Sequence, residues 1–175
     1  MYVFPVLFTE RLKLRQLFVY DFPSLIQLAN NKKISSRIIN IPFPYHEFHA
    51  VHRLRYVVEG FKSKAKFVFA IVLKDVNEFI GEISLNQRPE ENTYELGYWI
   101  GEPYWDQGYA TEAIAKVIDF GFQRLALQTI YATVDADNEP SAKVLVKNGF
   151  NSNGKKGNIC IYVVKQTQHS SKLRI

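Results

Sequence analysis

Residues 104–113 of this chain read Tyr-Trp-Asp-Gln-Gly-Tyr-Ala-Thr-Glu-Ala, and they mark the junction between a loop and a long helix. The apolar residues that follow at helical spacing are Ala110, Ile114, Ile118 and Phe122. A glycine where a helix begins lets unpaired backbone N–H groups converge beside the positive end of the helix dipole. The junction at Gly108 is therefore a candidate diphosphate site, although glycine also begins helices that bind no ligand.

The segments on both sides of this junction predict a mixed α+β fold. Alternating or continuous apolar runs between turn residues predict strands at 11–17, 67–73, 79–86, 94–100, 128–134, 150–153 and 158–165. Helical spacing and end signals predict helices at 21–30, 47–61, 108–124 and 137–148, with Asp21 as the cap of the first. Residues 154–157 are expected to join the last two strands. The order β-α-α-β-β-β-α-β-α-β-β predicts a central, mostly antiparallel, twisted sheet of six to seven strands with about four helices.

Length and composition suit one ordinary domain. The chain has 175 residues, 47% of them hydrophobic, so residues 1–175 are expected to form a single domain with a frayed polar tail at 166–175. No apolar run approaches the roughly 20 residues that a membrane span needs, and Glu10 and Arg11 come too early for a signal peptide. We therefore expect a cytoplasmic protein without a membrane partner. The lone Cys160 excludes an internal disulfide and a multi-cysteine site, and no metal site is expected.

The net charge of +5 is divided into blocks of opposite sign. Residues 1–66 hold 11 Lys and Arg against 4 Asp and Glu, residues 74–139 hold 4 against 13, and residues 140–175 hold 7 against none. An acidic middle between basic ends could serve a cationic acceptor and a polyphosphate, or these charges could simply be solvated. The sequence lacks a module with aromatic residues interleaved among Lys and Arg, so no specific nucleic-acid partner is expected.

Four sequence segments carry a family resemblance. Neither a Walker loop nor a dinucleotide fingerprint occurs in the chain. The four segments are Thr9–Arg15, Tyr94–Ile100 followed by Trp105–Ala113, Asp137–Ser141, and Lys147–Phe150. In order and spacing they resemble the GCN5-related N-acetyltransferase (GNAT) superfamily, in particular its RimJ/RimL-like branch of ribosomal-protein-alanine acetyltransferases. The resemblance extends from residue 9 to about residue 165.

This resemblance implies an N-acetyltransferase that moves an acetyl group from acetyl-CoA, its co-substrate, to a primary amine. The acceptor would be a protein N-terminus or a small cationic amine such as a polyamine. The backbone of Trp99 and Ile100 would pair with the pantetheine arm. The amides that would hold the pyrophosphate belong to Gln107, Gly108, Tyr109, Ala110 and Thr111. Asn138 would contact the CoA arm, with simple helix capping as the alternative.

The resemblance also implies catalytic roles and shows two departures. Glu95 is the candidate general base, with a solvent-facing carboxylate as the alternative and Glu82 in reserve. Ser141 would protonate the departing thiolate. Many superfamily members have a tyrosine four residues further on, where this chain has Leu145. Asp106 is the second departure, because a carboxylate beside a pyrophosphate weakens binding unless it points outward. A CoA-binding regulatory module without turnover is therefore the alternative function.

The chemical nature of the acceptor is indicated only by the charge and by the aromatic residues of the sequence. The acidic residues Glu90, Glu91, Glu95 and Glu102 favour a cationic amine. Residues 34–66 are expected to form much of the acceptor wall. The aromatic residues of that segment that could serve either as pocket or as core are Phe43, Tyr45, Phe48 and Phe61. The sequence leaves open whether the chain forms a homodimer.

Overall fold

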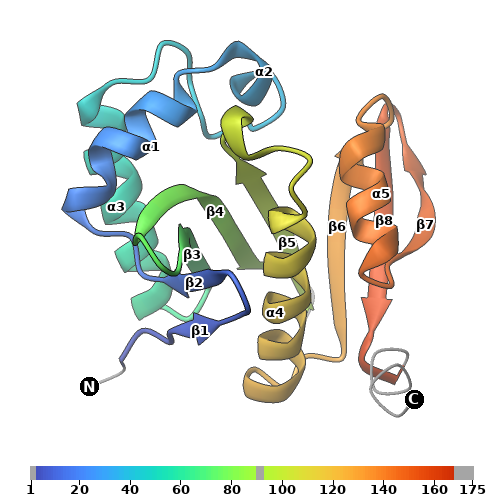
Figure 1. Ribbon diagram of the computed structural model, residues 1–175. Helices are drawn as coiled ribbons and strands as arrows, with labels where there is room; N and C mark the ends of the chain where they lie inside the picture. Colours follow the sequence, from blue (N-terminus) through green and yellow to red (C-terminus); the bar gives the residue numbers. More distant parts are fainter. Residues whose placement is uncertain (1–2, 90–92, 168–175) are drawn as a thin grey trace.

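The computed structural model describes residues 3–89 and 93–167, and in these residues one open eight-stranded sheet forms the centre of the protein (Figure 1). The strand order is β1-β2-β3-β4-β5-β6-β8-β7, and every neighbouring pair is antiparallel except β5–β6. The strands are β1 (Leu7–Phe8), β2 (Leu12–Arg15), β3 (Lys66–Leu73), β4 (Glu78–Gln87), β5 (Thr93–Ile100), β6 (Thr129–Asp135), β7 (Asn151–Lys156) and β8 (Ile159–Lys165). The α-helices are α1 (Phe22–Ala29), α2 (Lys32–Ser35), α3 (Glu47–Lys62), α4 (Tyr109–Arg124) and α5 (Glu139–Lys147).

The predicted α+β class and the mostly antiparallel sheet are confirmed. The prediction omitted β1 and α2, which span two and four residues and are too short to show a periodic pattern. The last connection differs as well. Strand β7 runs through Lys156 with an irregular register between Ser152 and Lys155, so the turn lies after residue 156 and not at 154–157. Of the expected frayed tail, residues 168–175 lie outside the described part of the chain.

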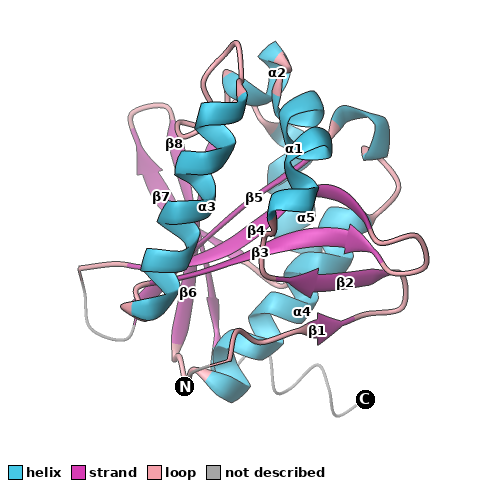
Figure 2. Cartoon of the chain, turned by 90° about the vertical axis from the view of Figure 1, so that its left-hand side faces the viewer, coloured by secondary structure: helices cyan, strands magenta, loops and turns pink. Residues whose placement is uncertain are grey.

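Helices cover both faces of the sheet (Figure 2). Strand β3 shows why, because its apolar run is buried on both faces. Phe67, Phe69 and Ile71 belong to the core under α4, whereas Ala70 and Val72 belong to the core under α1 and α3. None of the helices in the described ranges has the length and apolar character that crossing a membrane requires.

A buried ion pair connects β2 to α1. Asp21 stands before α1 as predicted, but its side chain makes no cap hydrogen bond to that helix. Both its oxygens instead accept hydrogen bonds from Arg15, at 2.7 and 2.8 Å, and Oδ2 also accepts one from the Phe18 amide. The Arg15 and Asp21 side chains are 3% and 2% exposed. A guanidinium buried to this degree needs a carboxylate partner, and that need outweighs one cap hydrogen bond.

Strand β5 pairs with β4 along its whole length but with β6 over only its first half. A Cβ atom at Gly81 of β4 would lie 2.2 Å from the Trp99 carbonyl oxygen, so only glycine permits this approach of the two strands. The β4–β5 pairing continues to Ile100. The parallel β5–β6 pairing, by contrast, ends at Leu96 and Ala132, while β6 stays paired with β8 to Asp135. The two strands therefore separate beyond Leu96.

Candidate functional site

The separation of β5 from β6 leaves backbone groups of β5 without a strand partner. The Gly101 amide donates to the Ile80 carbonyl at 2.8 Å, and the Arg88 amide donates to the Thr93 carbonyl at 2.9 Å. Because hydrogen-bonding directions alternate along a strand, odd-numbered residues of β5 face β4 and even-numbered ones face the gap. Of the two strand residues that the sequence singled out, Ile100 therefore faces the gap, and Trp99 faces β4. Tyr98 is the second residue whose backbone faces the gap.

Two groups at this strand end are already engaged in other contacts. The Ile100 carbonyl already accepts a hydrogen bond from the Trp105 indole at 2.6 Å. The Trp99 side chain is buried, and its indole donates to Glu82 at 3.0 Å. The groups that remain for an extended ligand are the backbone of Tyr98 and the amide of Ile100.

The loop after β5 ends in the predicted helix start. Gly108 has the left-handed conformation, with φ of 80°, and contributes no side-chain cap to α4. The bond from the Glu112 amide to the Gly108 carbonyl, at 3.1 Å, is the first backbone bond of the helix. The amides of Tyr109, Ala110 and Thr111 precede that bond and point out of the helix N-terminus. This geometry suits an anion, and a diphosphate in particular.

A cation lies directly beside this loop. Arg11, immediately before β2, donates from Nη1 to the Gln107 carbonyl at 2.9 Å and stacks over the Tyr109 ring at 4.4 Å. Its Nε and its backbone amide donate to Glu112, at 2.7 and 2.8 Å. Thr9 donates to the same carboxylate at 2.5 Å. Burial raises the pKa of Glu112, but these hydrogen bonds outweigh it and the net shift is downward, so the carboxylate stays charged and holds Arg11 at the loop.

Asp106 also lies in this loop. It has a left-handed φ of 59° and an exposed side chain. Arg11 was not singled out from the sequence, because it appeared only as one polar residue of an alternating strand. It nevertheless supplies the positive charge that can offset Asp106 beside a diphosphate.

Helix α5 brings Ser141 to β5. The Ser141 hydroxyl and the Tyr98 hydroxyl are 2.8 Å apart and share a hydrogen bond. Burial raises the pKa of Tyr98, while the Ser141 hydrogen bond lowers it less, so the phenol is protonated at neutral pH. Leu145 is fully buried on the same helix and belongs to the core. The contact with Ser141 brings the Tyr98 hydroxyl to helix α5.

Asn138 caps α5. Its side-chain oxygen accepts a hydrogen bond from the Ser141 amide at 3.3 Å. The capping alternative is therefore present in the structure. The cap uses only the oxygen and leaves the Nδ2 donors of Asn138 out of it.

The two candidate bases have different surroundings. Glu95 accepts a hydrogen bond from Thr133 at 2.5 Å and lies 3.7 Å from Arg88, at the point where β5 and β6 separate. Glu82 is only 2% exposed, and its two oxygens are held by Arg53 and Trp99. Neither of these two contacts joins Glu95 to the Tyr98–Ser141 pair. Glu95 is the more accessible carboxylate of the two.

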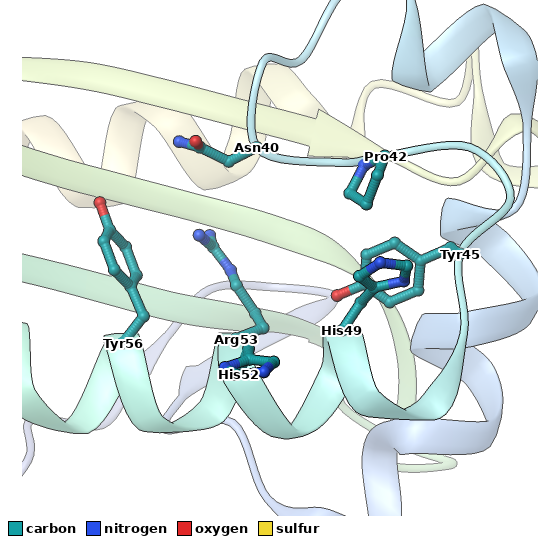
Figure 3. A pocket seen from close by; sticks show the side chains of 7 residues that line it. All are labelled: Asn40, Pro42, Tyr45, His49, His52, Arg53 and Tyr56. Carbon is teal, nitrogen blue, oxygen red and sulfur yellow. The ribbon is translucent and has the colours of Figure 1, made fainter.

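Two adjoining cavities lie beside α3: the outer one is lined by residues 40–56 alone, and the inner one lies between that segment and strands β4 and β5. The outer cavity has a volume of about 260 Å³ (Figure 3). The inner one, of about 220 Å³, reaches Gly97, Tyr98 and Trp99 of β5. Both include Asn40, Arg53 and Tyr56 in their walls.

The aromatic residues of this segment divide between pocket, core and surface. Tyr45 lines the outer cavity, whereas Phe61 packs in the core under α4. Phe43 and Phe48 are largely exposed and line neither cavity. Of the acidic residues expected around the acceptor, Glu102 pairs with Lys33 and lines neither cavity. Glu90 and Glu91 lie outside the described residues.

Ion pairs join the segment after α2 to the end of β6. Arg37, which follows α2, contacts Asp137 and Asp135 at the end of β6. It thereby ties the segment above the inner cavity to the side of the gap that carries Asn138 and Ser141. Among the described residues, no group of three His, Cys, Asp or Glu side chains is arranged to hold a metal ion.

The phosphate loop can be tested at Gly108. A β-branched residue in the left-handed region costs about 1–2 kcal/mol or more, and its side chain would fill the space beside Arg11. We expect Gly108→Val to weaken acetyl-CoA binding in titration calorimetry by at least about tenfold. Gly157, with φ of 59° in an exposed turn, is the matched control. Gly157→Val should lower the melting temperature and leave CoA affinity unchanged, and equal affinities for both variants would contradict the loop assignment.

Comparison with known proteins agrees with this geometry. Residues 11–151 match the family model described as an acetyltransferase (GNAT) domain. An uncharacterized N-acetyltransferase p20 of Bacillus licheniformis is 32% identical over 150 residues, which cover 85% of this chain and 83% of the relative.

Two solved structures share the fold. RimJ of Mycobacterium smegmatis in complex with CoA-disulfide superposes with a TM-score of 0.78 at 21% identity, covering 89% of this chain and 82% of that one. Spermidine N-acetyltransferase of Vibrio cholerae in complex with CoA and spermine superposes with a TM-score of 0.75 at 21% identity, covering 93% and 99%. With its gap between β5 and β6 and its helix-start loop, this chain belongs to the GNAT family of acetyl-CoA-dependent acetyltransferases.

Proposed function

We propose that this protein transfers the acetyl group of acetyl-CoA directly to a primary amine, on a protein N-terminus or a small molecule, with general-base assistance. One observation carries the proposal. Tyr98 lines the inner cavity and also shares a hydrogen bond with Ser141 across the gap between β5 and α5. The space for an acceptor and the space for the CoA arm would therefore meet at one residue, Tyr98.

The donor would be held mainly by backbone groups. The backbone of Tyr98 and the amide of Ile100 would pair with the pantetheine arm in place of the missing β6 partner. The amides of residues 107–111 would hold the pyrophosphate, with Arg11 beside them. Asn138 would donate its Nδ2 hydrogens to the arm while its oxygen caps α5. A strand amide facing the thioester carbonyl would stabilise the negative charge that develops on its oxygen.

The acceptor must lose a proton before or during attack, because an α-amine has a pKa of about 7.7–8.0 and lysine of about 10.4. We propose that Glu95 accepts this proton through a bridging water. Its strand partner Asn86 lines the inner cavity, so Glu95 lies on the same face of the sheet, one strand further along. Glu82 remains a weaker alternative, because Arg53 and Trp99 already occupy its oxygens.

The departing thiolate would take its proton from the Tyr98–Ser141 pair. A carbon–nitrogen bond forms as the carbon–sulfur bond breaks. The amine proton passes to Glu95, and the Ser141 hydroxyl proton passes to the sulfur. The Tyr98 hydroxyl can replace the proton on Ser141 through their shared hydrogen bond. This arrangement substitutes for the tyrosine that many superfamily members have where Leu145 is buried here.

The proposal is tested by combining binding with turnover. We expect acetyl-CoA to bind in calorimetry and free thiol to be released in the presence of a panel of primary amines. The buried Leu145 favours one competing function, a CoA-binding regulatory module without turnover. Binding without thiol release from any amine would establish the module and overturn the enzymatic proposal.

Glu95→Gln tests the base. The variant should slow turnover by about 100-fold near neutral pH, and its rate should rise with pH as more of the amine becomes neutral. Acetyl-CoA affinity should stay the same. The matched control is Glu78→Gln on β4, whose carboxylate also accepts a hydroxyl hydrogen bond, from Tyr104 at 2.8 Å. A wild-type rate and pH profile in Glu95→Gln would remove this residue from the mechanism.

Ser141→Ala and Tyr98→Phe test the proton donor. Each variant should lower kcat several-fold, and the double variant should be no slower than the slower single variant, because both act on one proton. Tyr94→Phe on the same strand removes a hydroxyl bonded to the Lys64 carbonyl at 2.9 Å and serves as the control. Wild-type turnover in Ser141→Ala would mean that the thiolate leaves without help.

A further inference from the structure

The outer cavity is lined by a partly buried arginine and by no carboxylate. Arg53 rises from α3 with its side chain 18% exposed, and it lines both the outer and the inner cavity. Its Nε and Nη2 bond to Glu82, at 3.1 and 2.9 Å. Its Nη1 has no hydrogen-bond partner among residues 3–89 and 93–167. In Figure 3 the guanidinium extends from α3 into the cavity, toward the segment that carries Asn40.

Other hydrogen-bond donors surround the same space. The Tyr56 hydroxyl and the Asn40 side chain face the region of the Arg53 guanidinium in Figure 3. Tyr45 lies on the opposite wall, and burial together with the Glu82 charge raises its pKa to about 12, so its hydroxyl stays a donor. Lys66 lines neither cavity, but its Nζ lies 3.9 Å from the centre of the Tyr56 ring.

A polycationic acceptor does not match this lining. Glu82 is the acidic residue in the wall of the inner cavity, and its oxygens are engaged by Arg53 and Trp99. A second ammonium of a polyamine would therefore enter a space that holds a guanidinium and has no available carboxylate. Desolvating such a charge without a partner is costly. A carboxylate, in contrast, would accept charge-assisted hydrogen bonds from Arg53 and from the neighbouring hydroxyl and amide groups.

We propose that the acceptor is a small amine that also carries a carboxylate, such as a free amino acid, with the carboxylate bound at Arg53 and the amine directed toward Gly97–Trp99. This inference rests on the proposed acetyl transfer and narrows its acceptor. Because Glu82 already neutralises part of the charge of Arg53, the carboxylate is expected to improve kcat/KM by about tenfold or somewhat more, and not by many orders of magnitude.

The test compares amines with and without that carboxylate, and each kcat/KM is expressed per neutral amine because the amide lowers the pKa of the neighbouring amine. Thiol release would be measured with L-phenylalanine and phenylalaninamide, with β-alanine and β-alaninamide, and with spermidine. The acid of each pair should have a kcat/KM at least about tenfold above that of its amide, and spermidine should be the poorer acceptor. Equal or better rates with the amides, or a preference for spermidine, would overturn the inference while leaving the acetyltransferase proposal standing.

If no amine is acetylated, binding measurements test the carboxylate site instead. The CoA-saturated protein would then be titrated with the same acids and amides. Tighter binding of the acids would support the carboxylate site even though the enzymatic proposal had failed. Equal binding of acids and amides, or binding of neither, would overturn the inference.

A double variant tests Arg53 itself. Arg53→Gln alone would leave Glu82 buried without its partner and could unfold the protein. The double variant Arg53→Gln with Glu82→Gln keeps two hydrogen-bonding amides at this place and removes both charges. It should lose the preference for acids over amides, with its folding checked by thermal melting. Arg55→Gln, an exposed position on the same helix that lines neither cavity, should keep the preference. An unchanged preference in the folded double variant would rule out Arg53 as the carboxylate partner.

Discussion

The parallel contact between β5 and β6 covers only four residue pairs, from Thr93 and Thr129 to Leu96 and Ala132. Each strand continues beyond that contact, because β4 holds β5 to Ile100 and β8 holds β6 to Asp135. The sheet therefore opens between β5 and β6, while each of these strands stays paired with its other neighbour. The backbone of Tyr98, the start of α4 and the start of α5 all lie around this opening. An extended ligand can complete the sheet there with its own amides, which is how a strand edge recognises a peptide-like arm.

The fold brings the basic and acidic segments of the sequence together as ion pairs. The basic first third and the acidic middle third pair with each other through Arg11–Glu112, Lys33–Glu102, Arg37–Asp137 and Arg53–Glu82. Most of the acidic charge considered for a cationic acceptor is thus engaged within the protein, or lies on residues 90–91 outside the described ranges. The cations Arg11 and Arg53 stand beside the helix-start loop and the outer cavity. Both of the proposed ligand spaces are consequently bordered by positive charge, which would suit an anionic group on each ligand.

Much of the candidate site was predictable from local signals, and some of it was not. Gly108 was identifiable because a glycine at a helix start has a specific geometric use, and the structure gives it the left-handed φ that glycine tolerates. Asn138 and Ser141 were found by their place in the family pattern, and the structure sets Ser141 against β5. Arg11 and Arg53 were not singled out, because a charged residue on an alternating strand or on a helix face is ordinary. Asp21 was assigned to a helix cap, but the buried Arg15 required its carboxylate.

The sequence by itself determined the class of fold, the order of the main elements and the position of the helix that begins after Gly108. These properties follow from periods of two and of 3.6 residues and from glycine and proline signals, all of which act within a few positions of the chain. Only the tertiary structure decided which side chains meet. Tyr98 and Ser141 are 43 positions apart, and Arg11 and Glu112 are 101 apart. No local period specifies such contacts, because they depend on how far β5 and β6 stay paired before they separate.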